Sequence, residues 1–449
     1  MSVLRVRPAR PLRGTSSVPG DKSIAHRLLL LASIAEGGCE ISGLPWSGDV
    51  GSTLACLARL LPESAPELQG WNSNPGVPAD GGGFTSDAPR PRPSMRVPGR
   101  GRSRLAPDPG ELDCGNSGTT MRLLLGLLAG APGSATLTGD PSLSSRPMER
   151  VARPLRDMGA RISTTEGHAP VAVAGGPLVG VRFEASVPSA QVKGALLLAG
   201  LAADGETEVL EPLPTRDHTE RILHALGVIP APAPKVRSAV VPAFRASVPG
   251  DASGAAFLAC AALASGGSVD VVGVGVNPTR VGFLALLRRM GATVQASVES
   301  ASLGEPVGTL DVRSGSRLGG IDVGADEVAA AIDEIPALAM LAALAQGSSR
   351  FRGVAELRLK ESDRVAGLVE AIRALGGSAE TDGEDLVVSG GGLGGGRVEP
   401  HGDHRIAMAA AAVAPGCRAA VEIAGAECAA ISFPGFPQAL RSLGADVEG

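Results

Sequence analysis

The sequence predicts a two-domain protein of the mixed α/β class (α/β, or α+β), assembled from six similar units. Its 449 residues exceed what one hydrophobic core usually serves, so two domains of about 200 residues each are expected. One pattern recurs along the chain: a polar or Gly/Pro-rich helix start, an Ala/Leu-rich helix, a glycine and a short β-prone run. The copies lie about 60 to 100 residues apart, which is longer than solenoid repeats and suits three units in each domain.

The first helix of each unit has a recognisable start. The six starts lie near Pro19, Cys114, Val187, Val248, Ile332 and Gly402. In the first unit Asp21 or Ser23 is a natural N-cap. We expect the helix proper over residues 28–35, with Glu36 and the two glycines that follow it ending the helix.

A second helical segment follows in each unit, and in all but the first copy it ends at a glycine. These segments cover residues 54–61, 154–159, 222–227, 286–291, 371–376 and 439–444. Polar and β-branched residues come next, so helices and strands are expected to alternate. Residues 62–110 break the pattern with Pro, Gly, Ser and Arg, and are predicted to form a long mobile surface excursion. The glycine-rich run 390–396 is predicted to be a turn between strands, since no helix follows it.

Composition excludes several classes of function. Aromatic residues make up only 2% of the chain and the formal charge is −5, which argue against a nucleic-acid partner. The apolar run 28–35 is too short to span a bilayer, and the N-terminus lacks the core of a signal peptide. The six cysteines form no CxxC pair, which is typical of reduced thiols. A cytoplasmic protein is expected.

Residues 19–27 form the first candidate site, because Lys22, Ser23 and Arg27 stand where a loop becomes a helix. Free backbone N–H groups at a helix start attract phosphate or carboxylate, and the two cations would add charge-assisted hydrogen bonds. The alternative is an ordinary capped helix with solvated charges.

Three further helix starts carry charged groups. Lys360 and Arg364 have i,i+4 spacing, and Glu361 and Arg364 have i,i+3 spacing, which places them together on a helix. The other two starts are Asp333-Glu334 and Asp403-His404-Arg405. A solvated, ion-paired helix start would look the same.

Taken together, these stretches identify a family resemblance over nearly the whole chain. In order, they are similar to motifs of the 5-enolpyruvylshikimate-3-phosphate synthase family: PGDKSIAHR (19–27), GNSGTTMR (115–122), SRPM (145–148), SAQ (189–191), GDAS (250–253), DEIP (333–336), KESDR (360–364) and DHR (403–405). Each motif is weak alone, but eight in the same order are specific.

The resemblance implies a fold and an activity. The fold would be a two-domain inside-out α/β barrel with three βαβαββ units per domain and helix N-termini facing the interdomain cleft. One domain would comprise residues 1–20 and 246–449, and the inserted domain residues 21–245. The implied reaction transfers the enolpyruvyl group of phosphoenolpyruvate to the 5-hydroxyl of shikimate 3-phosphate and releases phosphate. No cofactor or metal is expected, and the protein is expected to be a monomer.

The resemblance also implies roles for particular residues. Asp333 would be the base and Glu361 the acid, and Lys22 could share the proton transfer. The set for shikimate 3-phosphate would be Lys22, Ser23, Arg27, Ser189, Gln191, Arg216, Asp333 and Lys360. The set for phosphoenolpyruvate would be Lys22, Gly118, Arg146, Gln191, Arg364 and Arg405. Gly118 leaves room where an alanine methyl would intrude, so we expect glyphosate to inhibit at the phosphoenolpyruvate site.

Two positions depart from the family pattern. Ala190 stands where many members have Ser, so any contact there uses the backbone, and Ile431 stands where many have a phosphoenolpyruvate-contacting Lys. Two alternatives stay open. An enolpyruvyl transferase acting on UDP-N-acetylglucosamine would have Lys-Asn at the first helix start and a reactive loop cysteine, whereas Cys114 is expected to be packed. A non-catalytic anion-binding protein on the same scaffold would explain Ile431.

Overall fold

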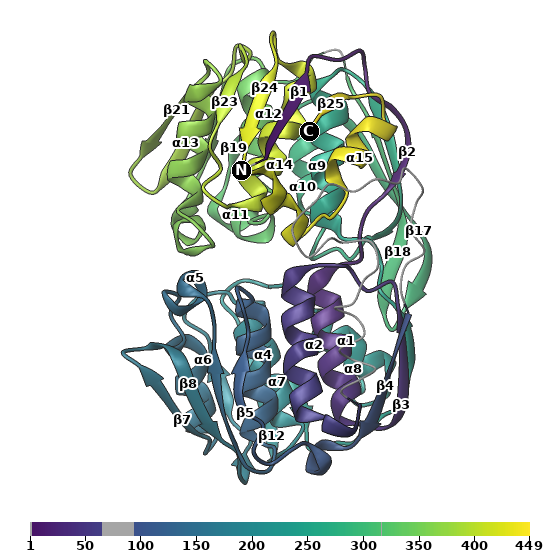
Figure 1. Ribbon diagram of the computed structural model, residues 1–449, viewed down its shortest axis with the longest axis vertical. Helices are drawn as coiled ribbons and strands as arrows, with labels where there is room; N and C mark the ends of the chain where they lie inside the picture. Colours follow the sequence, from purple (N-terminus) through teal and green to yellow (C-terminus); the bar gives the residue numbers. More distant parts are fainter. Residues whose placement is uncertain (1, 65–93, 316) are drawn as a thin grey trace.

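The structure is a computed structural model that describes residues 2–64, 94–315 and 317–449. It has two lobes, with both chain termini in one of them, the upper lobe of Figure 1. The upper lobe contains β1 (Val3–Arg7), β2 (Arg13–Ser17) and the elements from α9 (Ala252–Ala264) onward, and the lower lobe contains the elements from α1 (Lys22–Ile34) to β15 (Arg245–Ser247). The chain crosses between the lobes twice, and Gly20 and Gly250 form an antiparallel bridge between the two crossings.

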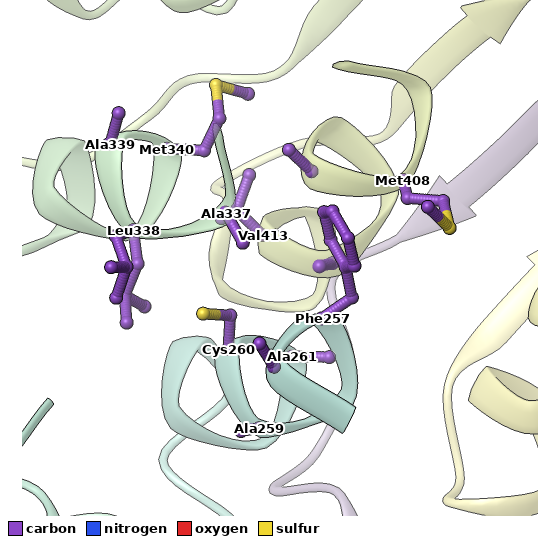
Figure 2. Close-up of a cluster of buried hydrophobic side chains, with 14 of the residues drawn as sticks. Phe257, Ala259, Cys260, Ala261, Ala337, Leu338, Ala339, Met340, Met408 and Val413 are labelled. Atoms are coloured by element: carbon purple, nitrogen blue, oxygen red, sulfur yellow. The ribbon is translucent and has the colours of Figure 1, made fainter. Parts of the chain in front are cut away.

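The upper lobe is built around three apolar helices, α9, α12 (Ile335–Leu344) and α14 (His404–Val413). Nearly all of their residues are buried, because a helix that is apolar on every face is stable only when it is covered on every face. Figure 2 shows the contact region, where Phe257 and Cys260 of α9 meet side chains of the other two helices. This cluster includes Leu4 and Val18 from the start of the chain.

Three four-stranded mixed sheets belong to the upper lobe. Their orders are β23-β24-β1-β25, β17-β18-β16-β2 and β19-β20-β22-β21. The strands not yet given are β16 (Ser268–Gly275), β17 (Thr293–Ser302), β18 (Glu305–Arg313), β19 (Asp322–Val323), β20 (Ser348–Phe351), β21 (Ser378–Asp382), β22 (Asp385–Ser389), β23 (Gly396–Val398), β24 (Val421–Ala424) and β25 (Asp446–Glu448). Short helical turns connect them: α11 (Ala325–Ala330), η4 (Val354–Leu359), η5 (Ala414–Gly416) and η6 (Ala426–Ile431).

The lower lobe repeats this plan with α1, α4 (Gly118–Ala129) and α7 (Ala190–Gly200) at its centre. Helices α4 and α7 approach so closely that a Cβ on Gly126 would lie 2.1 Å from the carbonyl oxygen of Ala195. The sheets are β14-β3-β15 with β4 on β3, β5-β6-β8-β7, β10-β12-β13 and the pair β11-β9.

The strands of these lower sheets are short. Their bounds are β3 (Ala35–Ser42), β4 (Ser94–Arg100), β5 (Gly110–Asp113), β6 (Ser134–Thr138), β7 (Arg161–Thr165), β8 (His168–Ala174), β9 (Leu178–Val179), β10 (Arg182–Glu184), β11 (Ala203–Asp204), β12 (Glu206–Leu210), β13 (Lys235–Arg237) and β14 (Val241–Pro242). The turns η1 (Pro62–Ser64), η3 (Arg102–Arg104) and α5 (Pro141–Ser144) complete the lobe.

The predicted second helices are confirmed as α2 (Gly48–Leu60), α6 (Glu149–Asp157), α8 (His218–Ala225), α10 (Phe283–Arg289), α13 (Arg364–Ala374) and α15 (Phe436–Ser442). The five predicted terminal glycines (159, 227, 291, 376 and 444) have φ angles between 72° and 101°. This left-handed conformation is how glycine ends a helix. The glycines therefore terminate these helices for the expected reason.

The first helix differs from its prediction at both ends. It begins at Lys22, directly after the N-cap Asp21, and it ends at Ile34. Glu36 and the two following glycines lie inside β3, which pairs with β4 from Glu36 to Ser42. The two glycines thus belong to a strand and do not stop the helix, because backbone pairing with β4 outweighs the local preference of glycine for a turn.

The predicted excursion over residues 62–110 is wrong for its last part. Residues 65–93 lie outside the described residues, but 94–100 form β4, in which Met95 and Val97 are buried between exposed neighbours. This alternation is the signature of a half-buried strand, and the surrounding Pro and Arg residues obscured it in the sequence. The turn over 390–396 is confirmed, since these residues join β22 to β23. Over the described ranges, no helix is long and apolar enough to cross a membrane.

Candidate active site

Helix starts from both lobes surround a cavity of about 640 Å³ between them. In the lower lobe α1, α4 and α7 contribute their first residues, and in the upper lobe Asp333 precedes α12 and Arg405 lies in the first turn of α14. Of the thirteen predicted site residues, twelve line this cavity: Lys22, Ser23, Arg27, Gly118, Arg146, Ser189, Gln191, Arg216, Asp333, Lys360, Glu361 and Arg405. Residues spread over most of the chain therefore meet in one place.

Capping side chains direct these helix starts. The carboxylate of Asp21 accepts hydrogen bonds from the backbone N–H groups of Ser23 (2.7 Å) and Ile24 (3.1 Å). Asp403 caps α14 through the N–H of Arg405 at 2.9 Å. A cap satisfies one or two of the free N–H groups and leaves the positive end of the helix dipole facing the cavity. The helix N-termini thus attract anions to this site even without the charges of the side chains.

Basic side chains outnumber acidic ones on the cavity wall. Eight cationic residues line it (Lys22, Arg27, Arg122, Arg146, Arg150, Arg216, Lys360 and Arg405), against five acidic residues (Asp49, Asp326, Asp333, Glu356 and Glu361). Burial lowers the pKa of both Arg27 and Arg122 to about 10, so these side chains remain charged near neutral pH. A chain with a formal charge of −5 therefore carries a locally positive cavity.

Lys22 is held by Asp49, with 2.8 Å between its Nζ and a carboxylate oxygen. Burial acts to lower the pKa of Lys22, but the attraction of Asp49 and Glu361 outweighs burial and the repulsion of Arg405, so that the pKa is raised. Lys22 is consequently an ammonium ion at neutral pH. Sequence reasoning missed Asp49, whose only signal was its position in the first turn of α2.

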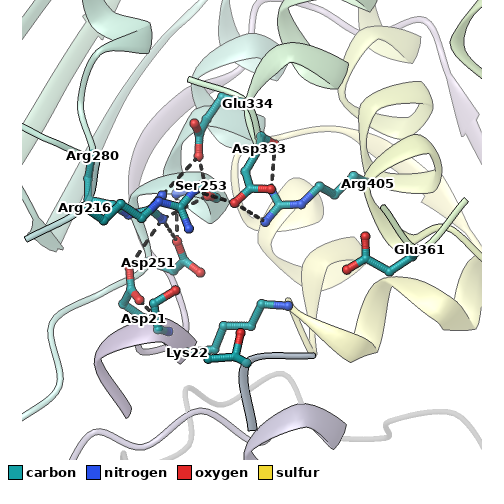
Figure 3. Close-up of polar contacts among 12 residues, drawn as sticks. Asp21, Lys22, Arg216, Asp251, Ser253, Arg280, Asp333, Glu334, Glu361 and Arg405 are labelled. Carbon is teal, nitrogen blue, oxygen red and sulfur yellow. Dashed lines mark hydrogen bonds and ion pairs between the residues drawn. The ribbon is translucent and has the colours of Figure 1, made fainter. Parts of the chain in front are cut away.

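Asp333 lies among cations from both lobes. It pairs with Arg216 of the lower lobe, and its backbone carbonyl accepts a hydrogen bond of 2.6 Å from Arg405 (Figure 3). Burial would raise the pKa of Asp333, but Arg405, Arg216, Lys360 and Arg364 lower it well below its ordinary value. The Lys360 pKa is lowered, chiefly by burial. Asp333 is therefore a carboxylate at any physiological pH.

Glu361 is bound to Arg364, as the i,i+3 spacing predicts. Burial would raise the pKa of Glu361, but Arg364, His404, Lys22 and Arg146 lower it well below its ordinary value. In Figure 3 its carboxylate and the ammonium group of Lys22 face the same space.

Arg364 is the one predicted residue that does not line the cavity. It is fully buried and also pairs with Asp403 at 2.9 Å and with Asp333 at 3.6 Å. The expectation that Lys360 shares a helical face with Arg364 is wrong, because α13 begins at Arg364 and Lys360 has an extended backbone. Arg364 instead pairs with the buried Asp403 and with Asp333 and Glu361 of the cavity wall, and these partners meet only in the folded chain.

A second cluster surrounds Gly118. Arg122 donates a hydrogen bond of 2.7 Å to the side-chain oxygen of Gln191, and Arg146 donates one of 2.8 Å to Asn116. A Cβ on Gly118 would lie 2.6 Å from a guanidinium nitrogen of Arg122 and 3.3 Å from one of Arg146. Glycine is thus required for this approach. Arg122 and Asn116 belong to the motif 115–122, so their signal was present although no role was assigned to them.

Arg27 connects the starts of two helices. It donates to the carbonyl oxygens of Ser23 (2.9 Å) and Ala190 (3.3 Å) and to the hydroxyl of Thr219 (2.9 Å). Ala190 contributes its backbone carbonyl to this contact with Arg27. Ser189 caps α7 through the N–H of Val192 at 3.3 Å.

Two further residues were considered in the sequence. Cys114 is fully buried, and the neighbouring Cys56 together with burial raises the pKa of its thiol, so it is packed, as predicted. Ile431 ends η6 and is not among the residues that line the cavity. Arg122 and Arg150 add positive charge to the cavity wall beyond that of the predicted residues.

Fold and site together define a class: a two-domain mixed α/β protein with a cavity between its lobes in which basic side chains outnumber acidic ones. A sequence model of the family EPSP synthase (3-phosphoshikimate 1-carboxyvinyltransferase) matches residues 6–71 and 91–440. A protein from Thermus thermophilus named 3-phosphoshikimate 1-carboxyvinyltransferase is 46% identical over 99% of both chains, and one of that name from Halorhodospira halophila is 45% identical over 99% of this chain and 96% of its own.

Solved structures agree with these sequence matches. The structure of EPSP synthase from Acinetobacter baumannii superimposes with a TM-score of 0.82 at 36% identity, covering all of both chains. The chain belongs to the EPSP synthase family.

Proposed function

We propose that this protein is an enzyme that transfers the enolpyruvyl group of phosphoenolpyruvate to the 5-hydroxyl of shikimate 3-phosphate. The products are 5-enolpyruvylshikimate 3-phosphate and inorganic phosphate. The observation that carries the proposal is the convergence of eleven motif residues and Arg216 on one cationic cavity in a chain of this family. The two substrates together carry two phosphates and two carboxylates, which is the ligand charge that such a cavity attracts.

We propose that the two substrates bind side by side in this one cavity and share Lys22 and Gln191. We assign phosphoenolpyruvate to Lys22, Gly118, Arg146, Gln191 and Arg405, and shikimate 3-phosphate to Lys22, Ser23, Arg27, Ser189, Gln191, Arg216, Asp333 and Lys360. The planar guanidinium groups suit bidentate contacts to carboxylate and phosphate. Holding both substrates side by side removes much of the entropic barrier, about 7–11 kcal/mol when the alignment is good. Arg364, buried beneath the wall, holds Asp333 and Glu361 in place.

Asp333 is the proposed base. Its depressed pKa keeps it ionised, so it can accept the proton of the 5-hydroxyl as that oxygen attacks the central carbon of phosphoenolpyruvate. The methylene carbon gains a proton at the same stage, which gives a tetrahedral adduct. Loss of phosphate and of one methyl proton then restores the double bond. The cations that bind the substrates also stabilise the anionic adduct.

The acid that protonates the methylene carbon is Glu361 or Lys22. Glu361 is ionised among its cations, so it can act as an acid only after the anionic substrate offsets those charges and raises its pKa. Lys22 already carries its proton. We propose that substrate binding leads Glu361 to take up a proton, which it then gives to the methylene carbon, and that Lys22 shares the transfer.

Further properties of the molecule complete the proposal. We infer an inside-out α/β barrel of three βαβαββ units per domain, with boundaries at residues 1–20 plus 246–449 and at 21–245. The two separate core clusters support this division, with the second crossing a few residues later than 245, since one cluster holds residues up to Val18 and from Ala252, and the other residues from Ile24 to Val248. We further propose a cytoplasmic monomer, and the six cysteines, all free, support a reducing compartment.

Phosphate release from phosphoenolpyruvate tests the proposal. Purified protein should release phosphate only when shikimate 3-phosphate is present, and absence of that dependence would refute the function. Asp333→Asn should lower kcat by about 10²–10⁴-fold, because the base is lost. Asp322→Asn, a change in an exposed ion pair of the same lobe, is the matched control and should retain kcat. Unchanged turnover in Asp333→Asn would remove the proposed base while leaving the overall reaction standing.

A further inference from the structure

A buried arginine outside the cavity wall, Arg280, lies where the chain crosses between the lobes. It belongs to the segment between β16 and α10, and its side chain is 3% exposed. Its guanidinium donates hydrogen bonds to Asp251 (2.9 Å) and to the hydroxyl of Ser253 (3.0 Å). It also lies 3.4 Å from a carboxylate oxygen of Asp21 and 3.7 Å from one of Glu334 (Figure 3).

The three carboxylates around Arg280 all stand at helix starts. Asp21 is the N-cap of α1 in the lower lobe, and Asp251 and Glu334 occupy the N-cap positions of α9 and α12 in the upper lobe. Each carboxylate is buried. The Ser253 hydroxyl joins the cluster by donating a hydrogen bond to Glu334. One cation thus binds the beginnings of three helices that come from both lobes.

Two of these helix starts carry the proposed reacting groups. Lys22 is the residue after Asp21, and Asp333 is the residue before Glu334. The backbone near the crossing is also tied, since the N–H of Asp21 donates to Pro249 (2.7 Å) and that of Asp251 donates to Pro19 (2.8 Å). Movement of Arg280 would therefore shift the cation Lys22 relative to the carboxylate Asp333.

Electrostatics support a single arrangement of this cluster. Burial would raise the pKa of Asp21, but Arg280 and then His218 and Arg216 lower it to about 2. Burial and the neighbouring Asp21 raise the pKa of Asp251. One guanidinium nitrogen of Arg280 contacts Asp21, Asp251 and Ser253, and a second faces Glu334. A lysine ammonium is a single compact charge and does not span both directions. Loss of a partner would leave buried carboxylates unpaired.

We propose that Arg280 is a positioning residue for the transfer reaction, which sets Lys22 and Asp333 at their working separation across the two lobes. The inference rests on the proposed function. Arg280 does not line the cavity, so it acts through the helix starts and not by touching substrate. A displacement on the order of 1 Å can cost about 100-fold in rate, which sets the size of effect expected.

Arg280→Lys tests this role, with Arg102→Lys as the matched control. Arg102 is partly buried, and it donates to the carbonyl oxygens of Leu127 and Leu198 near the ends of α4 and α7, away from the cavity. Both substitutions keep the positive charge but replace the guanidinium, which has several N–H donors in a plane, with a single ammonium group. We expect kcat to fall about 100-fold in Arg280→Lys and to stay within about twofold in Arg102→Lys, measured where circular dichroism shows both variants folded.

Equal kcat values in the two lysine variants would overturn the positioning role while leaving the proposed function intact. A wild-type protein that fails to release phosphate would overturn both.

If Arg280→Lys does not fold, two smaller substitutions test the positioning role of Arg280. Ser253→Ala removes the hydroxyl shared by Arg280 and Glu334, and Ser265→Ala removes a hydroxyl that bonds Leu12 and Ala262 at the other end of α9. We expect kcat to fall about tenfold in the first and to stay within about twofold in the second. A Ser253→Ala enzyme with the kcat of Ser265→Ala would refute the proposal.

Discussion

Arg216 and Asp333 pair across the cavity although they belong to different lobes. In the proposed reaction both contact shikimate 3-phosphate, so the substrate replaces their mutual contact with its own phosphate and hydroxyl groups. Exchanging one charge-assisted contact for another avoids leaving a buried charge unpaired. The same residues can thus satisfy each other before binding and recognise the substrate afterwards.

At the same scale, Gly118 sets the room available beside two guanidinium groups. A methyl group at Gly118→Ala would lie 2.6 Å from Arg122 and push that side chain off Gln191. We expect the KM for phosphoenolpyruvate to rise about tenfold, as for loss of one charge-assisted hydrogen bond. The inhibition constant of glyphosate should rise further, because its chain between carboxylate and phosphonate is longer.

Steady-state kinetics with and without glyphosate measure both constants. Gly319→Ala is the control, since a Cβ there has no atom within 4 Å. Identical glyphosate inhibition in Gly118→Ala and the wild type would show that the inhibitor does not use this space.

The buried side chain of His26 makes the free energy of unfolding depend on pH. It is fully buried and hydrogen-bonded to Thr53, and burial, with a smaller effect of Lys22 and Arg27, lowers its pKa from 6.5 to about 4. In the unfolded chain His26 binds a proton below about pH 6.5, whereas in the folded protein it binds one only below about pH 4. The free energy of unfolding therefore falls as the pH drops through this window, by about 2 kcal/mol between pH 7 and pH 5 from His26 alone.

His26→Gln should lose this part of the pH dependence. Urea unfolding at pH 7 and pH 5 gives the two free energies for the wild type, for His26→Gln and for the exposed control His401→Gln. We expect the control to follow the wild type and His26→Gln to lose about 2 kcal/mol less on acidification. A His26→Gln protein with the wild-type pH dependence would contradict the buried neutral state of this imidazole.

Among the elements, the central helices of each lobe share one design. Their small residues allow backbones to approach, and α4 and α7 meet at Gly126 with no space for a side chain. This contact fixes the separation of two helix starts, which carry Gly118 and Gln191. Packing in the core therefore determines the geometry of the cavity wall.

Gly126→Ala tests this packing at the element scale. Its Cβ would collide with the carbonyl oxygen of Ala195, which is backbone and cannot rotate away. We expect the free energy of unfolding to fall by about 3 kcal/mol, at the upper end of overpacking costs. Gly176→Ala, where a Cβ meets nothing within 4 Å, is the control. Equal urea midpoints for the two variants would show that α4 and α7 can separate freely.

For the whole molecule, the main feature is a positive cavity in a negatively charged chain. Basic side chains from both lobes concentrate the field in the space where the anions bind. Salt screens such fields over a distance of about 10 Å at 0.1 M ionic strength. Substrate capture should thus be more sensitive to salt than the chemical step, in which the charges are already in contact.

We expect the KM for phosphoenolpyruvate to rise about three- to tenfold between about 50 mM and about 500 mM KCl, with kcat within about twofold. Sucrose at matched osmolality is the control for effects of water activity. A KM that does not respond to KCl would argue that short-range contacts alone hold the substrate.

The sequence by itself determined the class of fold, the six first-helix starts, the five terminal glycines and twelve of the residues that line the cavity. These features are local: caps, glycines and apolar helices act within a few residues, and short motifs preserve their order.

Only the tertiary structure decided the rest, because it depends on partners far apart in the chain. Pairing with β3 made a strand of residues 94–100. Arg364 lies behind the cavity wall because it pairs with three carboxylates there. Asp49 contacts Lys22 because α2 packs beside α1. Arg280 gained three partners from two lobes in the same way. A buried charge without an opposite charge beside it is costly, so each of these groups is paired, and the elements that the fold brings together determine the partner.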